Sequence, residues 1–102
     1  MQFLVIAKVV PGVPMDKVLP LVKPEAAKVW EYYAADAVRN TYYIADMSGA
    51  VLLWEAPSLE AVTEMVAQLP MVQEGVLQTE ITPLKPYTGT ESLFAETGFP
   101  HH

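Results

Sequence analysis

The chain has 102 residues, 52% of them hydrophobic, and a net charge of −6 that comes from twelve Asp and Glu against six Lys and Arg. This length fits one domain with a substantial core, while the acidic balance and the single arginine argue against nucleic acid and anionic membrane surfaces as partners. The lack of cysteine excludes a disulfide framework, a thiolate nucleophile and a cysteine metal site, and it fits a cytoplasmic location.

The N-terminal half of the chain predicts a strand followed by helical segments. Residues 3–10 form an apolar run rich in β-branched side chains, and no basic region precedes it, so we expect a strand rather than a signal peptide. Two prolines allow only a short helical turn in residues 13–22. Pro24 then opens a longer helix. Its predicted buried face consists of apolar residues at helical spacing: Ala26, Trp30, Tyr33 and Ala37.

The C-terminal half predicts a hairpin, a second helix and a last strand. Residues 39–46 and 50–55 are expected to be strands, joined by a tight turn in which Gly49 supplies the positive φ angle. Ser58 is a suitable N-cap for a helix over residues 59–69. The predicted buried stripe of that helix is Leu59, Val62, Val66 and Leu69.

A strand over residues 76–82 is expected to end at Pro83. We therefore divide the chain into a domain of residues 1–85 and an extended C-terminal tail of residues 86–102 that packs on its own or a partner subunit. A helix that crosses a bilayer needs about 20 apolar residues, and no segment approaches that length.

This β-α-β-β-α-β order predicts a ferredoxin-like α+β fold, a four-stranded antiparallel sheet with both helices on one face. Because the strands are apolar on both faces, the second face also needs a cover. Leaving about five large apolar side chains in water would forgo roughly 10 kcal/mol, comparable with the stability of a whole domain. The chain has no spare element for this purpose. We therefore predict that an identical subunit covers the face, in a homodimer or a higher homo-oligomer.

The segment that begins Pro57-Ser58-Leu59-Glu60-Ala61 and ends Leu69-Pro70 resembles the second helix of muconolactone isomerases, which has a Pro-Ser-x-Glu-Ala start and a Leu-Pro end. The similarity extends over residues 1–85. It implies a dimeric α/β barrel in which two sheets face each other and ligands bind between sheet and helices. It also implies that the tail reaches a neighbouring subunit. Residues 40–43 depart from the Arg and His of the isomerases, so the resemblance does not extend to muconolactone as the substrate.

A lactone isomerase moves a proton between carbon atoms, which requires a base and a cation that holds the substrate carboxylate. Glu25 is the candidate base, and Arg39 is the candidate clamp because a guanidinium can bind a carboxylate through two hydrogen bonds. Both residues also have an ordinary interpretation. Glu25 suits the solvated first turn of a helix, and Arg39 suits a surface ion pair at a strand end.

Aromatic residues are numerous for so small a domain, and they can either line a pocket for an aromatic ligand or fill the core. The candidates for ligand binding are Trp30, Tyr33, Tyr42, Tyr43 and Trp54. The only histidines, His101 and His102, end the tail as native residues or as the remnant of a tag, so no catalytic histidine is expected in the core. We expect no metal site and no bound cofactor, since neither a ligand spacing nor a phosphate-binding glycine motif is present.

The sequence therefore favours an isomerase-like small-molecule enzyme or binding protein, acting on a lactone, aromatic or polyketide-like ligand without a bound cofactor. The alternative is a non-catalytic oligomerisation domain. The enzyme requires a closed apolar pocket into which Arg39, Glu25 or a tyrosine is turned. The oligomerisation domain requires a filled interior with the same polar groups in water.

Overall fold

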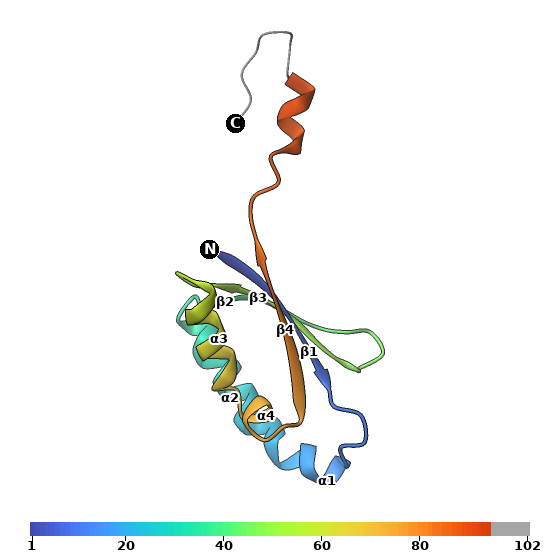
Figure 1. Cartoon of the computed structure of the whole chain (residues 1–102). Helices are drawn as coiled ribbons and strands as arrows, with labels where there is room; N and C mark the ends of the chain where they lie inside the picture. Colours follow the sequence, from blue (N-terminus) through green and yellow to red (C-terminus); the bar gives the residue numbers. More distant parts are fainter. Residues whose placement is uncertain (95–102) are drawn as a thin grey trace.

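The computed structural model describes residues 1–94 of the chain. In chain order its elements are β1 (Gln2–Val9), α1 (Met15–Val18), η1 (Leu19–Leu21), α2 (Val22–Ala34), β2 (Val38–Tyr43), β3 (Gly49–Glu55), α3 (Leu59–Ala67), α4 (Pro70–Gln73), β4 (Leu77–Leu84) and η2 (Gly89–Phe94). The strands form one antiparallel sheet in the order β2-β3-β1-β4, and α2, α3 and α4 lie on one side of it (Figure 1). The predicted ferredoxin-like α+β fold is therefore confirmed.

The core fills the space between the sheet and the helices. Phe3 and Val5 of β1 and Trp54 of β3 are all fully buried against the helices. Helix α3 begins as predicted, because the Ser58 hydroxyl accepts a hydrogen bond from the backbone N–H of Ala61 at 3.0 Å. Its buried stripe is confirmed at the three positions Val62, Val66 and Leu69. Leu59 is the exception, being 47% exposed at the first turn.

The predicted buried face of α2 is wrong. Trp30 and Tyr33 are 66% and 49% exposed, and the helix packs on the core through Val29 and Tyr32 instead. The Tyr32 ring lies 5.1 Å from the ring of Trp54, and the Lys28 ammonium covers it from 5.2 Å. Two apolar stripes one residue apart run along this helix. The periodicity of the sequence does not indicate which stripe is buried. In the structure the stripe with Tyr32 is buried, because its ring packs beside Trp54.

Prolines divide the helices differently from the prediction. Helix α2 begins at Val22, so Pro24 lies inside its first turn, where a missing N–H leaves no intrahelical bond unmade. Residues 59–69 do not form one helix, because α3 ends at Ala67 and Pro70 starts α4. Pro83 does not end the last strand. It lies within β4, which tolerates proline because it is an edge strand.

The β2–β3 hairpin places its positive φ angle at Met47, where φ is 63°, rather than at Gly49 as predicted. The carboxylate of Asp46 accepts a hydrogen bond from the N–H of Ser48 at 2.9 Å and so holds the turn around Met47. Gly49 is needed for another reason. A Cβ atom at this position would collide with the backbone oxygen of Ala7 on the neighbouring strand.

The face of the sheet away from the helices is apolar only along its two central strands. Leu4 and Ile6 of β1 pair with Leu53 and Val51 of β3, and all four side chains are half-buried. We call these four residues the open-face strip. The edge strands flank it with exposed polar or phenolic side chains: Asn40, Tyr42, Gln78, Glu80 and Thr82. The prediction of apolar residues on both faces is therefore confirmed for β1 and β3 only.

After β4 the described chain runs away from the sheet and ends in η2 (Figure 1). Tyr87, Leu93 and Phe94 are 82%, 78% and 75% exposed there. Phe99, His101 and His102 lie outside the described residues. The division into a domain of residues 1–85 and a tail stays a prediction. Over residues 1–94, no helix combines the length and the apolar character that a membrane crossing requires.

Candidate functional site

Arg39, the only arginine of the chain, lies on a β-bulge. Val38 pairs with Trp54 and Asn40 pairs with the next residue along β3, Leu53, so Arg39 is the extra residue between two regular pairs. A bulge bends its strand and redirects a side chain, which is why bulges recur beside functional sites. Because β2 is an edge strand, Arg39 lies at the rim of the sheet, near the start of the strand that follows α2.

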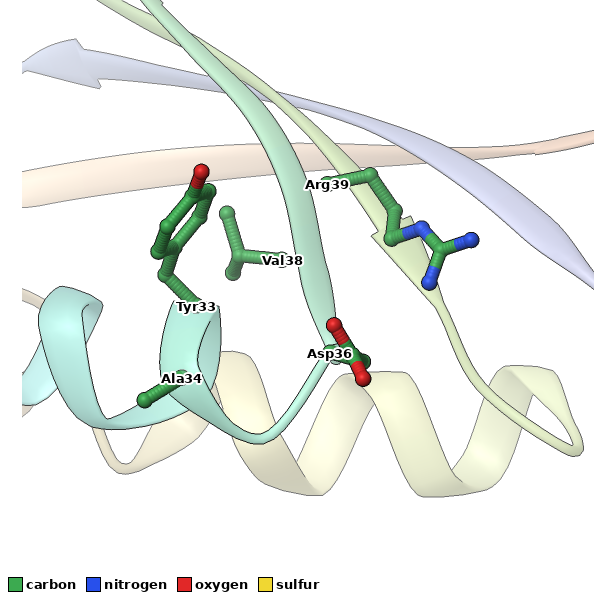
Figure 2. Close-up of a pocket in the computed structure, with 5 residues that line it drawn as sticks. All are labelled: Tyr33, Ala34, Asp36, Val38 and Arg39. Atoms are coloured by element: carbon green, nitrogen blue, oxygen red, sulfur yellow. The ribbon is translucent and has the colours of Figure 1, made fainter.

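An open pocket of about 450 Å³ lies where α2 ends and β2 begins. Its lining residues are Tyr33, Ala34, Asp36, Val38 and Arg39. Figure 2 shows the Tyr33 ring beside Val38, with Arg39 on the other side of the strand and its guanidinium turned toward the side of Asp36. The pocket thus combines an aromatic ring, a carboxylate and a guanidinium.

The loop between α2 and β2 has a defined geometry. The N–H of Ala37 donates to the carbonyl of Tyr32 at 2.9 Å, and the N–H of Asp36 donates to the carbonyl of Tyr33 at 3.1 Å. This pair of bonds is a Schellman motif, which ends a helix with one residue in the left-handed conformation. Asp36 is that residue, with φ at 62°. The two hydrogen bonds therefore hold Asp36 and the start of β2 in place.

The two opposite charges of the pocket form no direct ion pair with each other. The salt bridges within residues 1–94 join the N-terminal ammonium to Glu55 at 3.6 Å and Lys28 to Glu31 at 3.2 Å, and neither includes Arg39 or Asp36. The surface ion pair expected for Arg39 is therefore not found with any residue in this range. Both groups stay available to a ligand.

Only one of the five aromatic candidates lines this pocket. Tyr33 does so, and Trp30 packs beside it with ring centroids 5.6 Å apart, which extends the aromatic surface along α2. Tyr42 and Tyr43 are 61% and 75% exposed farther along β2. Trp54 is fully buried in the core, where its indole N–H has no hydrogen-bond partner within residues 1–94.

Glu25 has a structural role that the sequence did not indicate. Its carboxylate accepts a hydrogen bond at 2.9 Å from the N–H of Met71, the second residue of α4. The N-cap of α4, Leu69, cannot provide such an acceptor, so Glu25 caps this short helix from α2. Glu25 is half-buried. Burial raises its pKa, and this effect exceeds the lowering by the Met71 hydrogen bond.

The structure does not bring Glu25 and Arg39 together within one subunit. Glu25 lies in the first turn of α2. Arg39 lies beyond the opposite end of that helix, in β2, after the loop that follows Ala34. A rise of 1.5 Å per residue places about 13 Å of helix between them. The carboxylate that shares the Arg39 pocket is Asp36, which the sequence analysis missed. The available signal was an acidic residue at the predicted helix end, three positions before the only arginine.

The environment of Glu25 predicts a specific pH dependence for the Glu25→Gln variant. Because the folded-state pKa is raised above the ordinary value of 4.5, the folded protein binds more protons than the unfolded chain between these two pKa values. Stability therefore falls as the pH rises through this window. Glutamine removes the charge and keeps an oxygen for Met71, so the variant should be more stable at pH 7, by less than about 1 kcal/mol because Glu25 is only half-buried.

Urea unfolding of both proteins from pH 3 to pH 8 measures this effect. The advantage of Glu25→Gln should disappear below pH 4.5. A wild-type protein that is more stable than the variant at pH 7 would show that the charged carboxylate stabilises α4. Such a result would contradict the conclusion that burial affects the pKa of Glu25 more than the hydrogen bond from Met71 does.

Within residues 1–94, no group of three or more His, Cys, Asp or Glu side chains is arranged to hold a metal ion.

The fold and the pocket define a small ferredoxin-like α+β domain with an open pocket at the edge of its sheet. The chain belongs to the muconolactone delta-isomerase family, whose model matches residues 1–89. This match confirms the resemblance found in the helix that follows Pro57.

Solved structures agree with this assignment at the level of the fold. A 5-chloro-2-hydroxyhydroquinone dehydrochlorinase from Burkholderia phenoliruptrix, solved with 2,5-dihydroxybenzoquinone, matches with a TM-score of 0.71 and 22% identity, over 83% of this chain and 94% of that chain. A muconolactone isomerase matches with a TM-score of 0.71 and 23% identity, over 85% of this chain and 91% of that chain. No curated protein matches the chain.

Proposed function

We propose that this protein is a homo-oligomeric small-molecule enzyme that binds a small organic anion through Arg39. The observation that supports the proposal is the bulge in β2 that carries the only arginine, which is one of the residues that line the same open pocket as Tyr33. A guanidinium forms strong, charge-assisted hydrogen bonds with carboxylates and other oxyanions. Arg39 has no salt-bridge partner within residues 1–94 that would compete with such a ligand.

The size and the chemistry of the pocket suit a lactone, aromatic or polyketide-like ligand. The pocket is open to solvent, and its volume of about 450 Å³ gives room for a small organic molecule. The Tyr33 ring, supported by Trp30, offers an aromatic surface to a planar molecule. The names of the two structural relatives denote enzymes of small organic molecules, and one was solved with a dihydroxybenzoquinone. This supports the same ligand class here.

Glu25 is the second candidate for a catalytic role in this proposal. Its raised pKa brings the carboxyl closer to the range in which a general base works at neutral pH. Because Glu25 lies outside the Arg39 pocket, it can act on a ligand held by Arg39 only if that Arg39 belongs to another subunit of the homo-oligomer. The homo-oligomer part of the proposal is supported by the open-face strip, which the described residues of the chain do not cover.

One observation favours the alternative of a non-catalytic oligomerisation domain. The interior between α2 and the sheet is filled by side chains such as Phe3, Tyr32 and Trp54, rather than hollow. The exposed side chains of Trp30 and Leu19 on the helical side provide a further surface for assembly. The two functions differ in whether Arg39 binds an organic anion.

Isothermal titration calorimetry with benzoate and with its neutral analogue benzamide tests this difference. We expect wild-type protein to prefer benzoate, and Arg39→Gln to weaken benzoate binding by about 10- to 100-fold, since a hydrogen bond to a charged group contributes about 1.5–3 kcal/mol. Lys17→Gln, which removes an exposed cation on α1, is the matched control and should leave binding unchanged. Binding of benzoate that is equal in Arg39→Gln and wild type, or no binding of benzoate or of any hydroxybenzoate in wild type, would favour the oligomerisation domain.

A further inference from the structure

Asp36 occupies a backbone conformation that suits glycine better than aspartate. Its φ angle of 62° lies in the left-handed region, where the Cβ atom of an L-residue crowds the following carbonyl. Glycine, which has no Cβ atom, is the usual residue at this position of a Schellman motif. A side chain kept in such a conformation calls for an explanation in terms of what it contacts.

Contacts within the protein do not provide this explanation. The Asp36 carboxylate accepts no hydrogen bond and enters no salt bridge within residues 1–94, and the residue is exposed. The motif itself uses only the backbone N–H of Asp36. Glycine would form the same turn without the strain. The carboxylate therefore adds nothing to the fold that the structure shows.

The position of the carboxylate is informative instead. Asp36 lines the same pocket as Arg39 and Tyr33, and Figure 2 shows it at the start of β2, on the side of the strand to which the Arg39 guanidinium extends. A carboxylate beside the anion-binding guanidinium repels an organic anion that has no other polar group. The same carboxylate is favourable when the anion also carries a hydroxyl group, because the hydroxyl can donate a hydrogen bond to it.

Building on the proposed function, we infer that Asp36 is a specificity-determining residue that accepts a hydrogen bond from a hydroxyl group of the ligand while Arg39 holds its anionic group. The pocket then selects hydroxylated organic anions over otherwise identical anions without the hydroxyl. The ligand that lacks the hydroxyl forms no hydrogen bond with the carboxylate and meets only its negative charge.

Calorimetric titration with benzoate and with 2-, 3- and 4-hydroxybenzoate tests the inference. We expect wild-type protein to bind at least one hydroxybenzoate about 10-fold or more tightly than benzoate. In Asp36→Gly this preference should fall to within about 2-fold, with benzoate bound more tightly than by wild type. The melting temperature of Asp36→Gly should rise by about 4 °C or more, since the left-handed strain is relieved.

Two further variants test whether the negative charge of Asp36 or the shape of its side chain sets the preference. Together with Arg39→Gln, they also allow the inference to fail independently of the proposed function. Asp36→Asn tolerates the left-handed conformation but carries no charge, so it should lose most of the preference at an unchanged melting temperature. Asp16→Asn, on the exposed surface of α1, should change nothing. A hydroxyl preference that persists in Asp36→Gly, while Arg39→Gln still abolishes binding, would overturn the inference and leave the proposed function intact. Binding that does not depend on Arg39, or no binding of any of the four acids to wild type, would overturn both.

Discussion

Replacement of Trp54 by alanine is expected to lower the free energy of unfolding by about 3–5 kcal/mol, the usual cost of removing a large aromatic side chain from a core. Trp54 is fully buried and contacts the ring of Tyr32, the residue through which α2 packs on the sheet. Its removal leaves a cavity at the junction of β3 and α2. The total free energy of unfolding of a small domain is about 5–15 kcal/mol, so the variant should be only marginally stable.

The matched control is Trp30→Ala, because Trp30 is the only other tryptophan and is 66% exposed. This change should cost less than about 1 kcal/mol. Urea unfolding followed by far-ultraviolet circular dichroism measures both variants without relying on tryptophan fluorescence. Equal losses in the two variants would indicate that α2 turns its Trp30 side toward the core in solution, as the periodicity of the sequence alone suggested.

Introduction of a charge into the open-face strip is expected to dissociate or unfold the protein. Leu53 lies in the middle of the strip, paired with Leu4 on one side and Asn40 on the other. If a second subunit covers this face, an aspartate at position 53 places a carboxylate in an apolar interface. The uncompensated burial of such a charge costs several kcal/mol. Ile6→Asp should act in the same way, because Ile6 pairs with Val51 in the same strip.

Size-exclusion chromatography with light scattering, together with urea unfolding, reads out both effects. Thr63→Asp adds the same charge to the exposed surface of α3 and should leave the mass and the stability of the oligomer unchanged. A wild-type protein that is monomeric at micromolar concentration would contradict the homo-oligomer. Oligomers of unchanged stability in both Leu53→Asp and Ile6→Asp would show that another surface holds the subunits together, and the exposed apolar side of α2 would be the first to examine.

The candidate functional residues were predictable to different degrees. Arg39 could be chosen from the sequence because it is the only arginine, and a site for an organic anion requires a cation. Its position on a bulge could not be predicted, since a bulge arises from the register between β2 and β3. Asp36 was missed because its proposed role depends on a left-handed backbone angle and on a pocket, both of which form only when α2 meets β2.

Glu25 shows the opposite case. Its place in the first turn of a helix was predicted correctly from the nearby Pro24. The groups around it were not, because Met71 is 46 residues away along the chain and approaches only when α4 packs beside α2. The hydrogen bond and the partial burial of the carboxylate come from this packing, and they set the direction of its pKa shift.

The sequence by itself determined the order of the four strands and the two main helices, the cap at Ser58 and the family. These features depend on local signals: runs of β-branched residues, prolines at helix starts, and a capping side chain close to the bond it makes. The tertiary structure alone decided which stripe of α2 is buried and where the bulge in β2 lies. It also decided which carboxylate shares a pocket with Arg39. The physical reason is that side chains distant in sequence compete for the same space, and only their packing shows which of them fills it.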